Sequence, residues 1–220
     1  MLSDGLACDF RGAQTEVRTQ GQRSTCAVFA VTAAHEWMAG DRPDLSEEDA
    51  LYSAKQLEPG SGDATWVSTA LRAIDGEGQA LTEDWVYGSP HYSQGRPAPA
   101  TEATRRRRCG EVDDSPATTV ADLARVLVSH RAAILTVQFV PATWAAARDD
   151  GWIDDPDPPP AGGHAVLAVG CLVARGGRPQ AVVFKNSWSE DWGQDGYGFM
   201  TDRYLQVHHE HTDLLGATAS

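Results

Sequence analysis

The chain has 220 residues, which is long enough for one large domain or for two small lobes that share a core. Its 31 acidic and 18 basic residues give a formal net charge of −13, which argues against nucleic acid or an anionic membrane as the main partner. Because no run of eighteen apolar residues occurs, the sequence also predicts no membrane-spanning helix.

Three helices are predicted in the first half of the chain. Ser24 and Thr25 precede a long apolar segment that Gly40 ends, which is the pattern of a helix start and stop. A capping-box pattern that begins at Ser46 opens a second helix. Trp66 belongs to a helical repeat of apolar residues, which predicts that its ring packs in the core. We expect helices over about residues 25–39, 47–57 and 65–74, within a helical lobe over about 20–90.

The second half of the chain predicts mainly strands. Residues 87–118 contain several prolines and glycines, which is typical of a loop-rich connection. Apolar residues on one face predict a helix over 119–130, and a short helix begins at Pro141. A β-rich lobe over about 115–210 follows, so the expected fold class is α+β in a single domain, 1–220. Its strands are predicted at about 133–139, 164–173, 181–186 and 197–200.

Two basic or histidine-rich stretches do not by themselves indicate a site. The run Arg105–Arg108 is either a solvated stretch of an acidic chain, or a basic docking patch or processing site. His208, His209 and His211 lack the spacing of a convincing ligand set. We therefore expect exposed histidines and no metal site there.

Cys26 opens the first predicted helix. Backbone N–H groups and the helix dipole favour an anion at that position, so we expect the pKa of its thiol to fall. Gln20 lies six residues upstream, on a glycine-containing turn that can fold its amide back beside the sulfur. Such a thiol needs a base and an oxyanion donor to act as an acyl-transfer nucleophile. The other interpretation of Cys26 is a buried structural cysteine.

Two later stretches supply candidate partners for the thiol. His164 opens an apolar strand directly after Gly162–Gly163. Asn186 ends another strand and begins the sequence Asn-Ser-Trp-Ser-Glu-Asp-Trp-Gly-Gln-Asp-Gly-Tyr-Gly. The order glutamine, cysteine, histidine and Asn-Ser-Trp, followed by Trp-Gly and Gly-Tyr-Gly, resembles that of the papain-like cysteine peptidases. The resemblance covers nearly the whole chain.

The resemblance implies a fold and a role for each of these residues. In the papain-like fold, a helical lobe and a β-barrel-like lobe hold the active site in the cleft between them. Cys26 would be the nucleophile, and His164 the general acid/base whose ring Asn186 orients. Trp188 would shield the histidine–asparagine bond from water, and Gln20 with the Cys26 backbone N–H would hold the oxyanion. The implied activity is that of a cysteine endopeptidase, which hydrolyses peptide bonds through a thioester and uses no cofactor.

The resemblance also implies a surface that binds a protein or peptide substrate. We expect an apolar preference at the residue before the scissile residue, with Ala64, Thr65 and Val137 along that subsite. Part of the family's glycine-rich segment, which hydrogen-bonds substrate backbone in relatives, is present around Gly62. The full set of residues expected to bind substrate is Gly62, Asp63, Ala64, Thr65, Val137, Gly163 and Trp188.

Departures from the family pattern leave the chemistry and its control open. Gln22 and Ala27 stand where relatives have a cysteine and a tryptophan, and the family's other disulfide partners are missing. With no signal peptide visible over residues 1–5, we expect a cytoplasmic protein without disulfides. Residues matching the family's inhibitory N-terminal segment are not seen in this sequence, so we expect either that such a segment was removed or that control comes from a regulatory protein partner or from the loop Arg105–Arg108. Two alternatives to the peptidase remain: a transpeptidase, ligase or other acyl transferase on the same triad, or a catalytically silent binding module.

Overall fold

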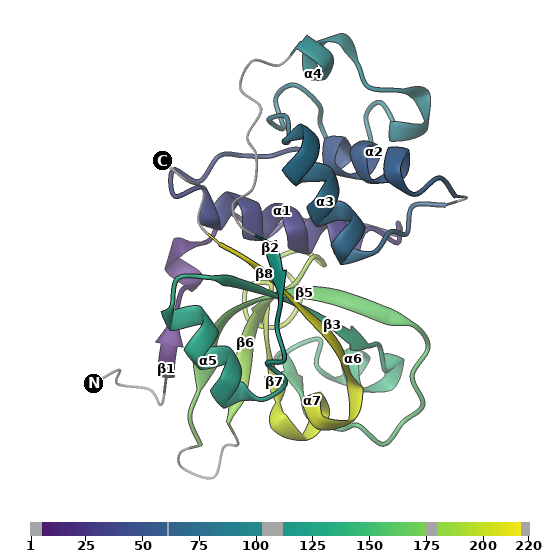
Figure 1. The fold of residues 1–220 in the computed structure, drawn as a ribbon. Helices are drawn as coiled ribbons and strands as arrows, with labels where there is room; N and C mark the ends of the chain where they lie inside the picture. The colour runs from purple at the N-terminus through teal and green to yellow at the C-terminus, as the bar shows by residue number, and fades with distance from the viewer. Residues whose placement is uncertain (1–5, 61, 103–111, 175–179, 217–220) are drawn as a thin grey trace.

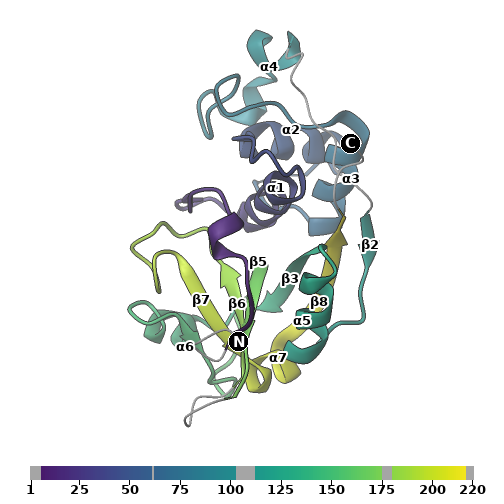
Figure 2. The same ribbon diagram turned by 90° about the vertical axis from the view of Figure 1, so that its left-hand side faces the viewer.

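The computed structural model describes residues 6–60, 62–102, 112–174 and 180–216. Figure 1 shows a group of helices above a sheet that carries further helices, and Figure 2 shows the same division after a quarter turn. The expected α+β class is confirmed, because the first helices of the chain gather on one side and the eight described strands share one sheet on the other.

Three helices form the upper, helical part: α1 (Cys26–Met38), α2 (Glu47–Leu57) and α3 (Val67–Glu77). Ser46 caps α2 as predicted, since its hydroxyl accepts a hydrogen bond from the Asp49 N–H at 3.1 Å. Thr25 precedes α1 but its side chain does not cap the helix, because its hydroxyl lies 2.7 Å from the Tyr87 hydroxyl instead. The first helix begins at Cys26 itself, one residue later than predicted.

An eight-stranded sheet forms the lower part of the described structure. Its strands pair in the order β2-β8-β3-β5-β6-β7-β4, and β1 is added beside β5. The described pairs are antiparallel, apart from the short parallel pair of β4 with β7. The strands are β1 (Leu6–Asp9), β2 (Val112–Asp114), β3 (Ala132–Gln138), β4 (Trp152–Ile153), β5 (Gly163–Leu172), β6 (Ala181–Lys185), β7 (Tyr197–Thr201) and β8 (His209–Leu215).

Four of these strands, β1, β2, β4 and β8, lie where the sequence predicts none. β1 precedes α1 and pairs with the far end of β5. β8 follows α7 (Asp202–His208) and lies between β2 and β3. The sequence of β8, His-Glu-His-Thr-Asp-Leu-Leu, begins with five polar residues and shows no clear alternation. Its strand conformation therefore depends on the ladder bonds to its neighbours and not on local propensity.

The two faces of the sheet pack against different helices. Along β3, Ile134 belongs to the core shared with α1, whereas Leu135 and Val137 belong to the core on the opposite face, as the period of two in a strand requires. That opposite face is covered by α5 (Val120–Val128), α6 (Pro141–Ala146) and α7. α1 lies between the sheet and the other helices and is buried over nearly its whole surface, which is typical of a helix that is apolar all round.

Short elements connect these parts. η1 (Arg11–Ala13) precedes α1, and the predicted loop-rich connection contains η2 (Tyr92–Gln94) and α4 (Ala98–Glu102). The run Arg105–Arg108 and Cys109 lie outside the described residues. Within the described part of the chain, no helix is both long enough and apolar enough to cross a membrane.

The cysteines provide a test of the predicted compartment. Three of the four are described, and all three are free thiols. Cys8 and Cys171 are cross-strand partners in β1 and β5, and both are buried. Because a reducing compartment keeps such a pair as thiols, we expect a thiol reagent to count four thiols in the denatured, unreduced protein. A count of two would contradict this expectation and would indicate an oxidising compartment.

Candidate functional site

Cys26 is the first residue of α1 and lies where the helical part meets the sheet. His164, at the start of β5, lines the same cavity as Cys26, and its side chain interacts with the thiol. Burial by itself raises the pKa of the Cys26 thiol, but the hydrogen bond and the charge of His164, with the N–H groups of Ala165 and Ala27, outweigh burial. The pKa of Cys26 is therefore lowered from its ordinary value, as the helix start predicts.

The side chain of Asn186 forms a hydrogen bond with the imidazole of His164. The Nε2 atom of His164 lies 2.9 Å from Oδ1 of Asn186, and both side chains are buried. The same oxygen accepts a hydrogen bond from the Ser187 N–H at 2.9 Å, which identifies it as the amide oxygen. Because that oxygen can only accept, Nε2 carries a proton and Nδ1 is left for the sulfur of Cys26. The structure thus brings Cys26, His164 and Asn186 together in one row.

Aromatic rings enclose the bond between His164 and Asn186. Trp188 stacks on the imidazole with the ring centroids 4.8 Å apart, and Trp144 meets it edge-on at 5.0 Å. Phe139 lies on a third side at 6.3 Å. Rings in these positions exclude water and so strengthen the hydrogen bond. Of the three, the sequence indicated only Trp188, because Trp144 and Phe139 carry no motif and reach His164 only through the packing of α6 on the sheet.

Gln20 lies beside Ser187, and hydrogen bonds hold its side chain at both ends. Its Oε1 accepts a hydrogen bond from the Ser187 hydroxyl at 2.6 Å, and its Nε2 donates to the carbonyl oxygen of Arg23 at 2.7 Å. The backbone N–H of Gln20 donates to the Ser187 carbonyl at 2.9 Å. These bonds join the turn that leads into Cys26 to the segment that carries Asn186, and one N–H of the Gln20 amide remains beyond the bond to Arg23.

A cavity of about 620 Å³ opens beside Cys26 and His164, between the helical part and the sheet. One wall comes from the loop before α3 and the start of that helix, and it includes Ala64 and Thr65. The other wall comes from β3, β5 and β8 and includes Gly163. Three of the residues predicted to bind substrate therefore line the same cavity as Cys26 and His164.

Val137 requires a correction. Its side chain is fully buried in the core on the opposite face of β3. Its neighbours Thr136 and Gln138 line the cavity instead. The reason is that successive side chains of a strand point to opposite faces, so an assignment that is wrong by one residue selects the wrong face of the sheet.

The other predicted binding residues lie outside this cavity. Asp63 forms an ion pair with Arg23 at 2.5 Å, and the carbonyl oxygen of Gly62 accepts a hydrogen bond from the Tyr92 hydroxyl at 3.0 Å. Trp188 lines a second cavity, of about 490 Å³, that lies beyond the aromatic cover of His164. Gly62 and Asp63 thus help to fix the loop before Ala64, and Trp188 lies between the second cavity and the buried histidine–asparagine bond.

Trp66, Glu58 and Glu210 also line the larger cavity, although the sequence did not predict them there. Trp66 is 67% exposed, so the prediction of a core ring is wrong. The reason is that α3 begins only at Val67, which leaves Trp66 in front of the helix and off its apolar face. Glu58, just after α2, and Glu210, on β8, place two carboxylates in the cavity walls. Neither glutamate belongs to a local motif that could have revealed it.

The three histidines near the end of the chain differ in burial and in their hydrogen-bond partners. His208 is buried, and its Nε2 lies 2.8 Å from the carbonyl oxygen of Pro156. Nε2 of His209 lies 2.8 Å from the Thr212 hydroxyl. The prediction of exposed histidines is therefore wrong for His208, which connects α7 to the loop after β4.

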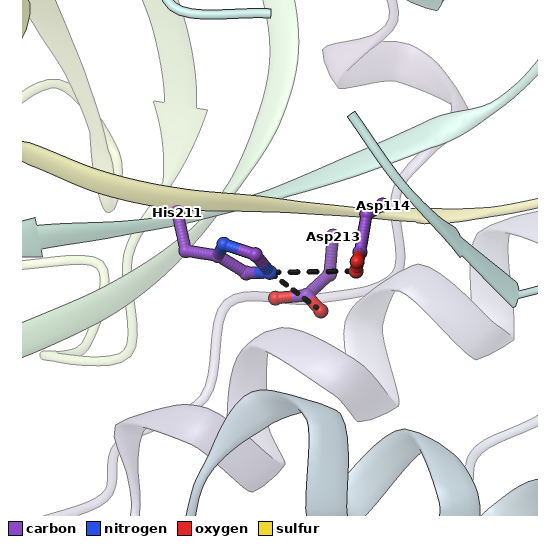
Figure 3. Close-up of side chains that lie close together, drawn as sticks. All are labelled: Asp114, His211 and Asp213. Carbon is purple, nitrogen blue, oxygen red and sulfur yellow. Dashed lines mark ion pairs between the residues drawn. The ribbon is translucent and has the colours of Figure 1, made fainter. Parts of the chain in front are cut away.

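His211 is exposed and lies between two carboxylates, as Figure 3 shows. Its Nε2 is 3.4 Å from Oδ1 of Asp114 on β2 and 3.6 Å from Oδ1 of Asp213 on β8. Burial raises the pKa of the Asp213 carboxyl. The histidine spacing does not indicate this cluster because Asp114 comes from a different strand. None of these three residues lines the cavity beside Cys26.

Known proteins resemble this chain in sequence. A family model described as papain family cysteine protease matches residues 6–213. Among curated proteins, cysteine endopeptidase RepA of Oryza sativa subsp. japonica is 28% identical over 202 residues. The match covers 85% of this chain and 49% of RepA, so the chain spans about half the length of that relative.

Solved structures resemble the chain in fold. Xylellain, a cysteine protease from Xylella fastidiosa, superposes with a TM-score of 0.76 at 18% identity, over 93% of this chain and 84% of its own. The bromelain protease from Ananas comosus, solved in complex with the E64 inhibitor, gives a TM-score of 0.74 at 21% identity, over 95% and 97%. At such identities the likeness concerns the fold alone, and it confirms the papain-like fold expected from the sequence.

Proposed function

The chain belongs to the papain family of cysteine proteases, and from this premise we propose that it hydrolyses peptide bonds with Cys26 as the nucleophile, His164 as the general acid/base and Asn186 as the residue that orients the imidazole. The substrate of a peptidase is a protein or a peptide. The net charge of −13 argues against nucleic acid or an anionic membrane as a further partner.

The proposed reaction has two halves. The Cys26 thiolate attacks the scissile carbonyl carbon, and the His164 imidazolium gives its proton to the departing amine, which leaves a thioester on the sulfur. Water then attacks the thioester carbonyl while the neutral His164 imidazole removes a proton from that water. The carbon–sulfur bond breaks, the carboxylic acid product departs, and the thiolate–imidazolium pair is restored. No cofactor takes part in either half.

Each tetrahedral intermediate carries a negative oxygen, for which we assign two donors. The first is the backbone N–H of Cys26 at the start of α1, and the second is the side-chain amide of Gln20. The bonds of Gln20 to Ser187 and Arg23 support this role, because they fix the amide in advance of the reaction. Removal of one such donor typically costs about 2.7–4 kcal/mol of barrier.

One observation carries the proposal. The imidazole of His164 has its Nε2 beside Oδ1 of Asn186 and interacts with a thiol at a helix start, in the wall of an open cavity. A buried structural cysteine would need neither the cavity nor an oriented histidine. The same geometry lowers the pKa of Cys26, which is the change that turns a thiol into a nucleophile near neutral pH.

The pH dependence of alkylation tests this proposal. In the proposed mechanism the Cys26 thiolate forms an ion pair with the His164 imidazolium, and the pKa of the Cys26 thiol is lowered. Alkylation of Cys26 by a small haloacetamide is expected to stay fast well below pH ~8.5, the value of a free thiol. The rate should fall only in acid, where the thiolate becomes protonated. His164→Ala is expected to move the profile back toward that of an ordinary thiol. Rates that rise only near the free-thiol value, and are unchanged by His164→Ala, would contradict the ion pair.

The compartment and the control of activity are further parts of the proposal. We place the protein in the cytoplasm, and the free state of the three described cysteines supports a reducing environment. A regulatory protein partner is proposed as the source of control.

A further inference from the structure

We propose that the cavity beside Cys26 and His164 selects a lysine or arginine side chain at the substrate residue before the scissile residue, and that Glu210 determines this specificity. The inference rests on the proposed function. It replaces the apolar preference that the sequence predicted for this subsite. Ala64 and Thr65 line the cavity as predicted, but the apolar side chain of Val137 does not, and the carboxylate of Glu210 does.

The charges in the cavity walls favour a cation. Apart from Cys26 and His164, the ionisable side chains among the described lining residues are those of Glu58 and Glu210, and no described lysine or arginine lines the cavity. Lys55 lies nearby, but its ammonium group donates a hydrogen bond to the Ala64 carbonyl and the side chain is buried. Two carboxylates in a partly enclosed cavity attract a positive side chain and repel a negative one.

Glu210 is well placed to meet a substrate side chain. Its carboxylate lies beside the start of β5, where a β-carbon placed on Gly163 would be 3.7 Å from its Oε2. Gly163 directly precedes His164, so the carboxylate lies close to the reacting groups. Glu210 is exposed and makes no hydrogen bond or ion pair with other described residues. It can therefore pair with an incoming guanidinium or ammonium without breaking an existing bond.

The opposite wall fits the rest of a long cationic side chain. Trp66 presents an exposed ring, and Val67 adds apolar surface beside it. Lysine and arginine have apolar stems that pack on such surfaces, and their charged ends are attracted by an indole face. Glu58 supplies a second carboxylate, although its Oε2 already accepts a weak bond from the Thr65 hydroxyl at 3.5 Å. We therefore assign the main selective role to Glu210 and a smaller one to Glu58.

Two fluorogenic peptides that share a neutral scissile residue and carry arginine or leucine before it provide the test. We expect the wild-type protein to cleave the arginine peptide with the higher kcat/KM. Glu210→Gln is expected to reduce kcat/KM for the arginine peptide by about ten- to a hundredfold, the usual effect of one hydrogen bond to a charged group, and to leave the leucine peptide little changed. Glu210→Lys should favour a peptide with glutamate at that position. Glu190→Gln, the same change at an exposed site that does not line the cavity, should alter neither peptide.

Binding to the inactive protein separates this inference from the proposed function. In Cys26→Ala, calorimetry is expected to show tighter binding of the arginine peptide than of the leucine peptide, and Glu210→Gln should remove the difference. If the wild type cleaves neither peptide while this binding preference holds, the proposed function is overturned and the assignment of the cavity stands. If the leucine peptide is preferred, or if Glu210→Gln affects both peptides equally, the role of Glu210 is overturned.

Discussion

Replacing Cys26 by alanine is expected to abolish peptide cleavage and to leave the fold intact. The substitution removes the atom that forms the proposed thioester, and loss of a nucleophile in a comparable triad lowers kcat by on the order of 10⁵- to 10⁶-fold. Stability should change little, by about 1 kcal/mol or less, because the side chain lies in the wall of an open cavity and its removal leaves no enclosed void. Hydrolysis of a fluorogenic peptide and thermal unfolding measure the two effects.

A second cysteine provides the matched control for this experiment. Cys8 is buried in the pair of β1 with β5 and does not line the cavity beside Cys26. Cys8→Ala is expected to keep full activity per folded molecule, although it loses some stability to the cavity it creates. Retained turnover by purified Cys26→Ala would exclude Cys26 as the nucleophile.

Replacing Glu36 by alanine is expected to cause the largest loss of stability, about 3–5 kcal/mol. Glu36 lies on α1 and is 0% exposed. One carboxylate oxygen pairs with the Arg18 guanidinium and accepts a hydrogen bond from the Leu45 N–H at 2.9 Å, while the other accepts from the Thr15 hydroxyl. Alanine would leave the buried Leu45 N–H without its acceptor and would remove the fully buried partner of Arg18, which keeps Glu47 as an ion-pair partner. A buried donor left without an acceptor costs more than the pair itself contributes. Urea unfolding should report the loss in the free energy of unfolding, and thermal unfolding should show a fall in Tm on the order of 10 °C.

Asp44 offers a control that shares the same cation. It also pairs with Arg18, at 3.2 Å, but its side chain is 73% exposed, whereas that of Glu36 is buried. Solvent screens such a pair, so Asp44→Asn is expected to cost less than about 1 kcal/mol. Equal losses for the two variants would contradict the view that burial, and not the ion pair alone, determines the contribution of Glu36.

Local patterns along the chain, together with the order of the site residues, were sufficient to predict much of the fold. The capping pattern at Ser46 and the apolar periodicity placed α1, α2 and the strands β3, β5 and β6 within a few residues of their observed bounds. Cys26 at a helix start and His164 at a strand start follow from local rules, because helix caps and strand alternation depend on residues close by in sequence.

What the sequence by itself determined about this protein is therefore its α+β class and the residues that meet at the site. Which other side chains line the cavity was decided only by the tertiary structure. β8 has no apolar alternation and becomes a strand because β2 and β3 supply its hydrogen-bond partners. That strand brings Glu210 beside Gly163, and the late start of α3 leaves Trp66 facing the same cavity. Both contacts join segments that are distant in the chain, so no local pattern encodes them. The alternation of β3 likewise decides that Thr136 and Gln138, and not Val137, face the cavity.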